Sequence, residues 1–320
     1  MPSLSFEPGK KSDSTPIALV NGGDYNGDYL YLVNEEGSTR RAPKVELNLT
    51  EAEQLLRHMS PKDRHAELLR MEEAFNSGQK PTDYVGKGKD AYEVCFLKAT
   101  KNSEKKLELP PECSFTLLPT ADKAKRDVWF IAGPSGAGKS YIAKTLAEKY
   151  RKQFPDRPIY LVSKLPSDET LDSMKGGKPI RINVQKLVDS PIKELEPLRD
   201  SLVLFDDYDT YTAPFDKAVF KLIDDIATMG RHTNTSMLCM SHYLTNYKKT
   251  RLLLTEATHY VIYPNTTGRQ ALSYFLKTYV GMDDDEISEL KRMGSRWICI
   301  HKNYPMWLVS EHSAKLLHLE

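Results

Sequence analysis

The residues most able to do chemistry lie in one glycine-rich segment. Residues 133–140 read Gly-Pro-Ser-Gly-Ala-Gly-Lys-Ser directly after an apolar run, which is the pattern of a phosphate-binding loop between a strand and a helix. Glycines let successive backbone N–H groups face phosphate oxygens, Lys139 supplies positive charge, and Ser140 offers a hydroxyl to Mg²⁺. The expected nucleotide contacts are Gly133, Pro134, Ser135, Gly136, Ala137, Gly138, Lys139, Ser140 and Tyr141. The alternative is a chance glycine-rich turn, against which the preceding strand and the following helix argue.

Two carboxylates follow a second apolar strand. Asp206 and Asp207 come directly after residues 202–205, which read Leu-Val-Leu-Phe. We expect Asp206 to reach the metal shell, and Asp207 to orient an attacking water and take its proton. The alternative is a solvated acidic turn, to which Asp209 would contribute.

An arginine and a histidine flank the next apolar strand, expected at 237–240. Arg231 follows a helix end in a loop that can lie at a subunit boundary, so we expect an arginine finger that stabilises charge on a γ-phosphate. The alternative is a surface arginine beside a helix C-terminus. His242 lies at the tip of the strand, where it could hydrogen-bond the γ-phosphate. A buried histidine bonded to a backbone carbonyl is the alternative for His242.

These side chains need a sheet to bring them together. From about residue 123, apolar runs alternate with amphipathic helices, the pattern of a mainly parallel sheet with helices on both faces. Further strands are expected at 159–162, 180–184 and 260–263, helices at 219–229, 268–279 and 284–293, and a closing β-hairpin at 297–301 and 306–309. We therefore expect one α/β domain over residues 121–320.

Residues 1–120 are expected to form a small α+β domain of unknown role. Its expected strands are 17–20, 29–33, 92–97 and 114–118, with helices after a capping box at Thr50 and Glu53 and after Ser60-Pro61.

One stretch of this region has partial calcium-loop spacing. Asp24, Asn26, Asp28 and Glu35 fall at positions 1, 3, 5 and 12 of such a loop, but Tyr29 occupies the sixth position, which needs glycine. The flanking segments also look like strands rather than helices, so a plain hairpin is the better interpretation.

Taken together, the motifs of residues 123–310 resemble the FtsK–HerA superfamily of DNA-pumping ATPases. Within it they are most similar to the genome-packaging ATPases of large double-stranded DNA viruses, such as the poxvirus packaging ATPase. The most specific piece is Gly230-Arg231-His232 leading into the apolar strand. Two positions depart from the family: Asp207 stands where cellular members usually carry glutamate, and His242 where the family commonly carries glutamine. The first departure leaves the hydrolysis rate open, and the second the coupling of γ-phosphate loss to movement.

The resemblance implies a RecA-like (ASCE) P-loop NTPase fold and hydrolysis of ATP with Mg²⁺. It implies that Lys139 and Ser140 contact nucleotide and Mg²⁺, Asp206 the Mg²⁺, Asp207 acts as base, and Arg231 reaches a neighbouring subunit's nucleotide. It also places the strand 237–240 between the phosphate-loop strand and the strand 202–205, beside the γ-phosphate.

The partners implied by the resemblance are double-stranded DNA, further copies of the chain in a ring of five or six subunits, and viral capsid or portal components. Lys248, Lys249 and Arg251 are candidate contacts with DNA phosphates, although a short basic run is often only a solvated surface.

Composition limits the partners and the compartment. The net charge of +1 argues against coating nucleic acid by electrostatic attraction alone, so any contact must be local. The 4 cysteines lack Cys-x-x-Cys spacing, which fits a reducing compartment. No apolar run approaches roughly 18 residues and the N-terminus is polar, so we expect neither a membrane span nor secretion. The resemblance implies that the location is the virion or the host-cell cytoplasm.

Two other functions stay open. A P-loop kinase would need an arginine-bearing lid and an acceptor pocket. A scaffold that binds ATP with little turnover would use the N-terminal domain as its functional part.

Overall fold

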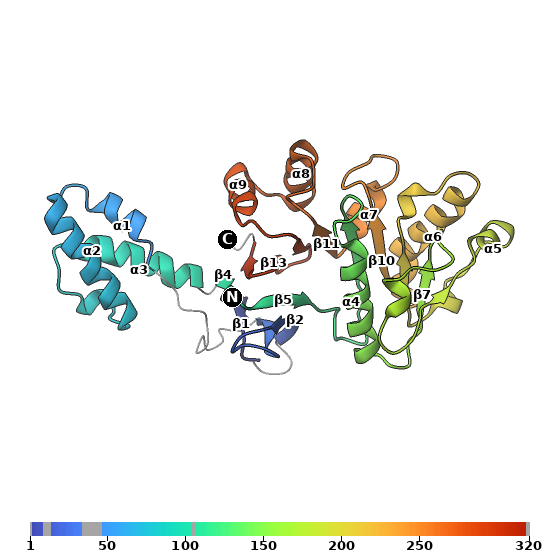
Figure 1. Ribbon diagram of the computed structural model, residues 1–320, viewed down its shortest axis with the longest axis horizontal. Helices are drawn as coiled ribbons and strands as arrows, with labels where there is room; N and C mark the ends of the chain where they lie inside the picture. The colour runs from blue at the N-terminus through green and yellow to red at the C-terminus, as the bar shows by residue number, and fades with distance from the viewer. Residues whose placement is uncertain (1, 9–13, 34–46, 104–105, 318–320) are drawn as a thin grey trace.

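The computed structural model describes residues 2–8, 14–33, 47–103 and 106–317. Figure 1 shows a helical unit, α1 to α3, at one end, a four-stranded sheet in the middle, and a ten-stranded sheet running from the middle to the other end. The strands are β1 (Ser3–Ser5), β2 (Ser14–Asn21), β3 (Tyr29–Val33), β4 (Lys106–Glu108), β5 (Ser114–Leu117), β6 (Val128–Ala132), β7 (Ile159–Val162), β8 (Ile180–Arg181), β9 (Leu202–Phe205), β10 (Ser236–Ser241), β11 (His259–Ile262), β12 (Ile298–His301), β13 (Trp307–Ser310) and β14 (Ser313–Leu316). The α-helices are α1 (Leu49–Leu55), α2 (Pro61–Asn76), α3 (Lys89–Ser103), α4 (Lys139–Gln153), α5 (Val184–Asp189), α6 (Phe215–Met229), α7 (Arg251–Glu256), α8 (Arg269–Phe275) and α9 (Asp284–Arg292).

The large sheet has the order β4-β14-β13-β12-β11-β6-β10-β9-β7-β8. Strands β11, β6, β10, β9, β7 and β8 are parallel, and β12, β13, β14 and β4 extend the sheet antiparallel. Strand β10, the strand expected at 237–240, pairs with both β6 and β9, so its predicted position between these two strands is confirmed. The predicted P-loop NTPase fold with a mainly parallel sheet is likewise confirmed.

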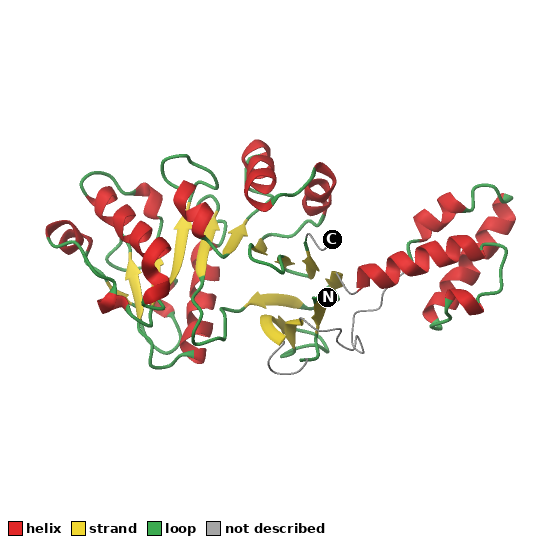
Figure 2. Ribbon diagram, turned by 180° about the vertical axis from the view of Figure 1, so that it is seen from behind, coloured by secondary structure: helices red, strands yellow, loops and turns green. Residues whose placement is uncertain are grey.

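Alternating side chains of β6 explain why helices cover both faces. Trp129 and Ile131 join the apolar cluster that holds helix α4, while Val128, Phe130 and Ala132 join the cluster that holds α6. A strand buried on both faces must be apolar throughout, and every residue of β6 is buried. Figure 2 shows these strands between helices on either side.

Several predicted elements differ from the structure at the edges of the sheet. The strand expected at 180–184 is only the two residues of β8, because Asn183 caps helix α5 through the N–H groups of Gln185 and Lys186. The closing hairpin forms, but β14 and then β4 continue it. The helix expected at 268–279 is α8 followed by a π-helical turn, Leu276–Val280.

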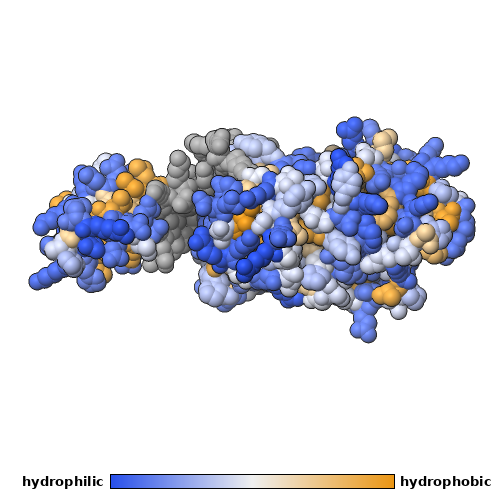
Figure 3. All heavy atoms as spheres, turned by 90° about the horizontal axis from the view of Figure 1, so that it is seen from above, coloured by the Kyte–Doolittle hydropathy of each residue, from blue (hydrophilic) through white to orange (hydrophobic). Residues whose placement is uncertain are grey.

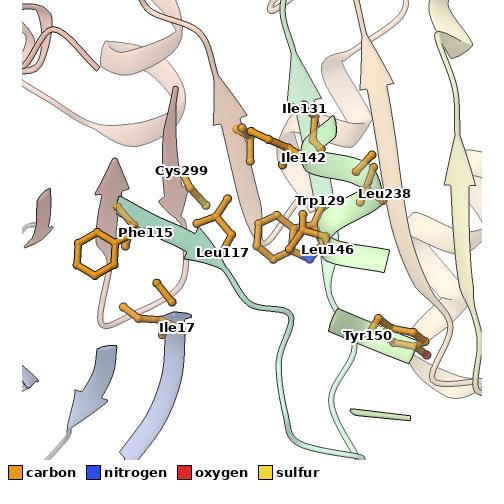
Figure 4. Packing of buried hydrophobic residues seen from close by; sticks show 14 of the residues in the cluster. Ile17, Phe115, Leu117, Trp129, Ile131, Ile142, Leu146, Tyr150, Leu238 and Cys299 are labelled. Carbon is orange, nitrogen blue, oxygen red and sulfur yellow. The ribbon is translucent and has the colours of Figure 1, made fainter. Parts of the chain in front are cut away.

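The small sheet, ordered β1-β3-β2-β5, packs against the same core as the large one. Figure 4 shows Ile17 of β2 and Leu117 of β5 in the same apolar cluster as Cys299 of β12 and Trp129 of β6. The predicted hairpin of β2 and β3 is confirmed by their antiparallel pairing. Glu35, the last residue of the calcium-loop spacing, lies outside the described residues.

Helices α1 to α3 have a separate apolar cluster. The strand expected at 92–97 is wrong, because these residues lie in α3. Tyr92 and Cys95 are buried while Val94 and Leu97 are exposed, a helical spacing rather than the alternation of a strand. The capping box at Thr50 is also wrong: Asn48 caps α1 by accepting from the N–H of Glu51. Ser60 caps α2 as predicted.

A buried acid at the start of β6 makes the stability of this fold depend on pH. Asp127 is 6% exposed and accepts a hydrogen bond from the Thr120 N–H at 2.7 Å, and burial raises its pKa to about 6. An unfolded chain releases this proton near pH 3.9, so the folded state binds more protons between about pH 4 and 6. Its contribution to stability is present at low pH and is lost as the pH rises through this window.

We expect Asp127→Asn to remove up to about 3 kcal/mol of the change in unfolding free energy between pH 4 and pH 7. Urea denaturation of both proteins at several pH values measures it. Asp122→Asn is the control, because the Asp122 side chain is exposed. Equal pH dependence of the wild type and Asp127→Asn would show that Asp127 does not titrate as inferred.

Candidate nucleotide-binding site

The predicted phosphate-binding loop joins β6 to α4 at the carboxyl edge of the large sheet. Helix α4 begins at Lys139 after Gly138, whose φ of 108° is closed to most other residues. A side chain at Gly133 would meet the Tyr263 ring at 2.6 Å. The loop therefore needs glycine at both positions, and it ends at the N-terminus of helix α4, where backbone N–H groups are free to bind an anion.

The remaining loop residues differ in how far they are exposed. Pro134, Ser135 and Gly136 are exposed, Ala137 is buried, and Ser140 is half-buried in the first turn of α4. Tyr141 is 69% exposed.

Lys139 is buried, although it carries a charge. Its ammonium donates to the carbonyl of Gly133 at 3.0 Å and of Pro134 at 3.4 Å, and lies 3.5 Å from Asp207 Oδ1. The structure thus brings the predicted base of one strand end to the predicted lysine of another. Asp207 has a φ of 40°, a left-handed conformation that turns the chain sharply after β9.

Asp206, the predicted metal ligand, is 9% exposed and accepts a hydrogen bond from Ser163 Oγ at 2.9 Å. Burial, and then the neighbouring charge of Asp207, raise its pKa to about 6. A carboxylate disfavoured in this way gains from a nearby cation. The oxygen donors of Asp206 and Ser140 fit Mg²⁺, which binds few protein ligands and keeps several waters.

His242 lies directly after β10, beside the loop that follows β9. Its Nε2 is 3.6 Å from Asp207 Oδ2, and its Nδ1 is 3.4 Å from Asp209 Oδ1. Register explains this meeting, because Cys239 of β10 pairs with Phe205 of β9 and the residues beyond both strands are then neighbours. The alternative of a histidine bonded to a backbone carbonyl does not describe these contacts.

Arg231 is not brought to the other site residues within one chain. It lies in the 3₁₀ turn Gly230–His232, ahead of β10, while the phosphate loop follows the parallel strand β6. Arg231 is therefore at the opposite edge of the sheet, and its side chain is exposed. Any role on a nucleotide requires a second copy of the chain.

The three candidate DNA contacts have different surroundings. Lys248 is exposed, and Arg251 donates to the Tyr247 hydroxyl at 2.8 Å beside a ring that is 77% exposed. Lys249 instead donates to the backbone carbonyl of Asp209, inside the molecule. Lys248 and Arg251 are thus the candidates with groups at the surface.

Sequence reasoning gave no role to three further side chains near the loop. Asp209 is 1% exposed beside His242, and its only signal was the spacing Asp-Asp-Tyr-Asp. Arg296 donates to the Ala137 carbonyl at 3.4 Å, and the buried Tyr263 hydroxyl has no hydrogen-bond partner in the described part of the chain. No local pattern could indicate Arg296, because it reaches the loop only through the fold.

Among the described residues, no helix is both long and apolar enough to span a bilayer. The face seen in Figure 3 is largely hydrophilic, with small scattered apolar areas.

Comparison with known proteins gives one sequence relative. No protein-family model matches the chain. The uncharacterised protein V3 of Sputnik virophage is 31% identical over 249 residues, which cover 76% of this chain and 98% of that protein.

Similar solved structures include the DNA-packaging ATPase B204 of Sulfolobus turreted icosahedral virus, at 14% identity, 58% of this chain, 98% of that chain and a TM-score of 0.42. The cytoplasmic domain of the Thermomonospora curvata type VII secretion ATPase EccC is 14% identical over 64% of this chain and 28% of that chain, with a TM-score of 0.43. Both are described as ATPases, but TM-scores of 0.42 and 0.43 assign no function to this chain. On the strength of the virophage relative, the chain belongs to the same protein family as protein V3 of Sputnik virophage.

Proposed function

We propose that this protein hydrolyses ATP at the subunit interfaces of a ring and uses the energy to move double-stranded DNA into a viral capsid. The observation that carries the proposal is the line Lys139–Asp207–His242 at the carboxyl ends of β6, β9 and β10, in which the Asp207 carboxylate lies 3.5 Å from the Lys139 ammonium and 3.6 Å from His242 Nε2. Relatedness to a virophage protein supports a viral role. A virion or host-cell location, and capsid or portal partners, are parts of the same proposal.

Each side chain has a task in this reaction. The loop N–H groups and Lys139 bind and orient the β- and γ-phosphates, and Lys139 leaves the loop carbonyls to do so. The Asp207 carboxylate orients the attacking water and accepts its proton. Mg²⁺, held by Ser140 and Asp206, would neutralise charge on the phosphates. Arg231 of a neighbouring subunit then stabilises the charge that spreads over the γ-phosphate in the transition state.

Duplex DNA is expected to stimulate ATP hydrolysis several-fold, with a strong decrease as salt rises, because phosphate contacts release counterions. The rate of phosphate release, measured without DNA and with duplexes of several unrelated sequences over a range of salt concentrations, tests this expectation. Lys248→Ala with Arg251→Ala should lower the dependence of log affinity on log salt by about 2, at about 0.9 for each contact.

The matched control is Lys178→Ala with Lys217→Ala, which removes two charges from exposed lysines elsewhere. A rate of ATP hydrolysis that does not change with duplex DNA would contradict a translocase and favour the ATP-binding scaffold.

A cavity of about 610 Å³ beside Asp206 gives the kinase alternative a specific basis. It lies where β7 and β8 end and is lined by Ser163, Lys164, Arg181, Asn183 and Tyr211 among others, so an acceptor substrate could bind there. The reaction products decide between the two functions. Release of inorganic phosphate in proportion to ADP supports hydrolysis, whereas ADP without inorganic phosphate would indicate transfer to an acceptor.

A further inference from the structure

Asp209 is a buried carboxylate whose contacts all lead to the end of β10. Its Oδ2 accepts hydrogen bonds from Ser241 Oγ at 3.0 Å, from the His242 N–H at 2.9 Å and from the Tyr243 N–H at 3.3 Å. Its Oδ1 faces His242 Nδ1 at 3.4 Å. Removing a carboxylate from water is unfavourable unless hydrogen-bond donors replace the water. Here the donors belong to residues 241–243, so the Asp209 carboxylate fixes the position of that segment.

We propose that Asp209 is a positioning residue that orients the His242 imidazole for ATP hydrolysis, with Nε2 on the Asp207 side of the site, an inference that rests on the proposed function. Because a carboxylate only accepts, its contact places a hydrogen on Nδ1 of His242. In a neutral ring with that hydrogen, Nε2 is an acceptor on the side where Asp207 faces Lys139, so it can take a hydrogen bond from the attacking water there.

A histidine at this position needs such a partner more than an amide side chain would. A glutamine presents a donor and an acceptor together at the end of its side chain. An imidazole presents one nitrogen to the site, and the hydrogen bond made by the other nitrogen decides its role. Asp209 supplies that second bond.

The backbone of the Asp209 turn is held by contacts other than its carboxylate. Lys249 Nζ donates to the Asp209 carbonyl, and the Tyr208 hydroxyl donates to the Lys249 carbonyl at 3.1 Å. The variant Asp209→Asn keeps these contacts and nearly the same shape. Its amide oxygen can accept the three hydrogen bonds of Oδ2, which leaves the N–H₂ group facing His242 Nδ1; Nδ1 must then accept, so the ring hydrogen moves to Nε2 while the turn remains.

The test is steady-state ATP hydrolysis by the full chain with Mg²⁺ and duplex DNA. For Asp209→Asn we expect kcat to fall at least about tenfold, as for loss of a group that acts in the transition state, with KM for ATP within a few-fold of the wild type. In a His242→Gln background, Asp209→Asn should change kcat less than about twofold, because its target is gone. An equal loss in both backgrounds would overturn the proposal, since Asp209 would then act on the fold and not through His242.

Asp225→Asn is the matched control, because Asp225 lies on α6 in an exposed pair with Lys221 and should leave kcat unchanged. A second measurement does not depend on any variant folding. In wild-type protein labelled with ¹⁵N-histidine, the His242 Nδ1 resonance should show a bound proton, and an unprotonated Nδ1 would contradict the proposal. If the wild type hydrolyses no ATP, the proposed function fails, but the resonance still tests the Asp209–His242 contact.

Discussion

Lys139→Ala should lower kcat for ATP hydrolysis by about 10³-fold or more, the largest effect expected from one substitution within the site. The ammonium is buried, and it lies between the loop carbonyls and Asp207. Its removal takes away the charge that neutralises the phosphates in the transition state. Nucleotide binding should weaken as well, which fluorescence of a labelled ATP analogue measures alongside phosphate release.

Lys144→Ala is the control for this variant, because Lys144 lies on the same helix and donates to Ser173 Oγ, away from the loop. It should hydrolyse ATP like the wild type. Substantial hydrolysis by Lys139→Ala would mean that the loop is not the catalytic phosphate site.

Arg231→Ala should lower kcat by about 10³ to 10⁵-fold, although Arg231 lies at the far edge of the sheet from its own phosphate loop. The loss should appear only in assemblies, because the proposed mechanism has the arginine act on a neighbour's nucleotide. Nucleotide binding by the separate chain should stay unchanged, which separates this variant from Lys139→Ala.

Mixing the two inactive variants gives the sharpest test of an interface. A subunit with Arg231→Ala keeps an intact loop, and a neighbour with Lys139→Ala keeps an intact arginine, so mixed assemblies contain some complete sites. We expect activity to return in the mixture and to depend on total protein concentration.

Arg199→Ala is the matched control, since the exposed Arg199 pairs with Glu196 and contacts the His232 carbonyl near Arg231. It should keep activity. No recovery in the mixture, or full activity of Arg231→Ala alone, would contradict a finger supplied by a neighbour.

Local sequence patterns predicted the elements whose signals lie within a few residues. The phosphate loop, β9 with Asp206 and Asp207, and the long apolar face of α6 are all present as predicted, since spacing along one strand or helix decides which side chains share a face. The same reasoning failed for α3. A short apolar run fits a strand or a buried helix, and only packing against α1 and α2 selects the helix.

Contacts between distant segments could not be predicted in the same way. Strands β14 and β4 pair at the sheet edge although they lie far apart along the chain, at Ser313–Leu316 and Lys106–Glu108, and their pairing follows from available edges rather than from their composition. Arg296 reaches the phosphate loop from a turn far along the chain.

The sequence by itself determined the glycine-rich connection between β6 and α4 and the acidic end of β9, because the pattern of each is local. Only the tertiary structure decided that Asp209 holds His242, that His242 faces Asp207, and that Arg231 lies away from its own site. The physical reason is strand register. Placing β10 between β6 and β9 fixes which loop residues meet at one edge of the sheet and which are left at the other.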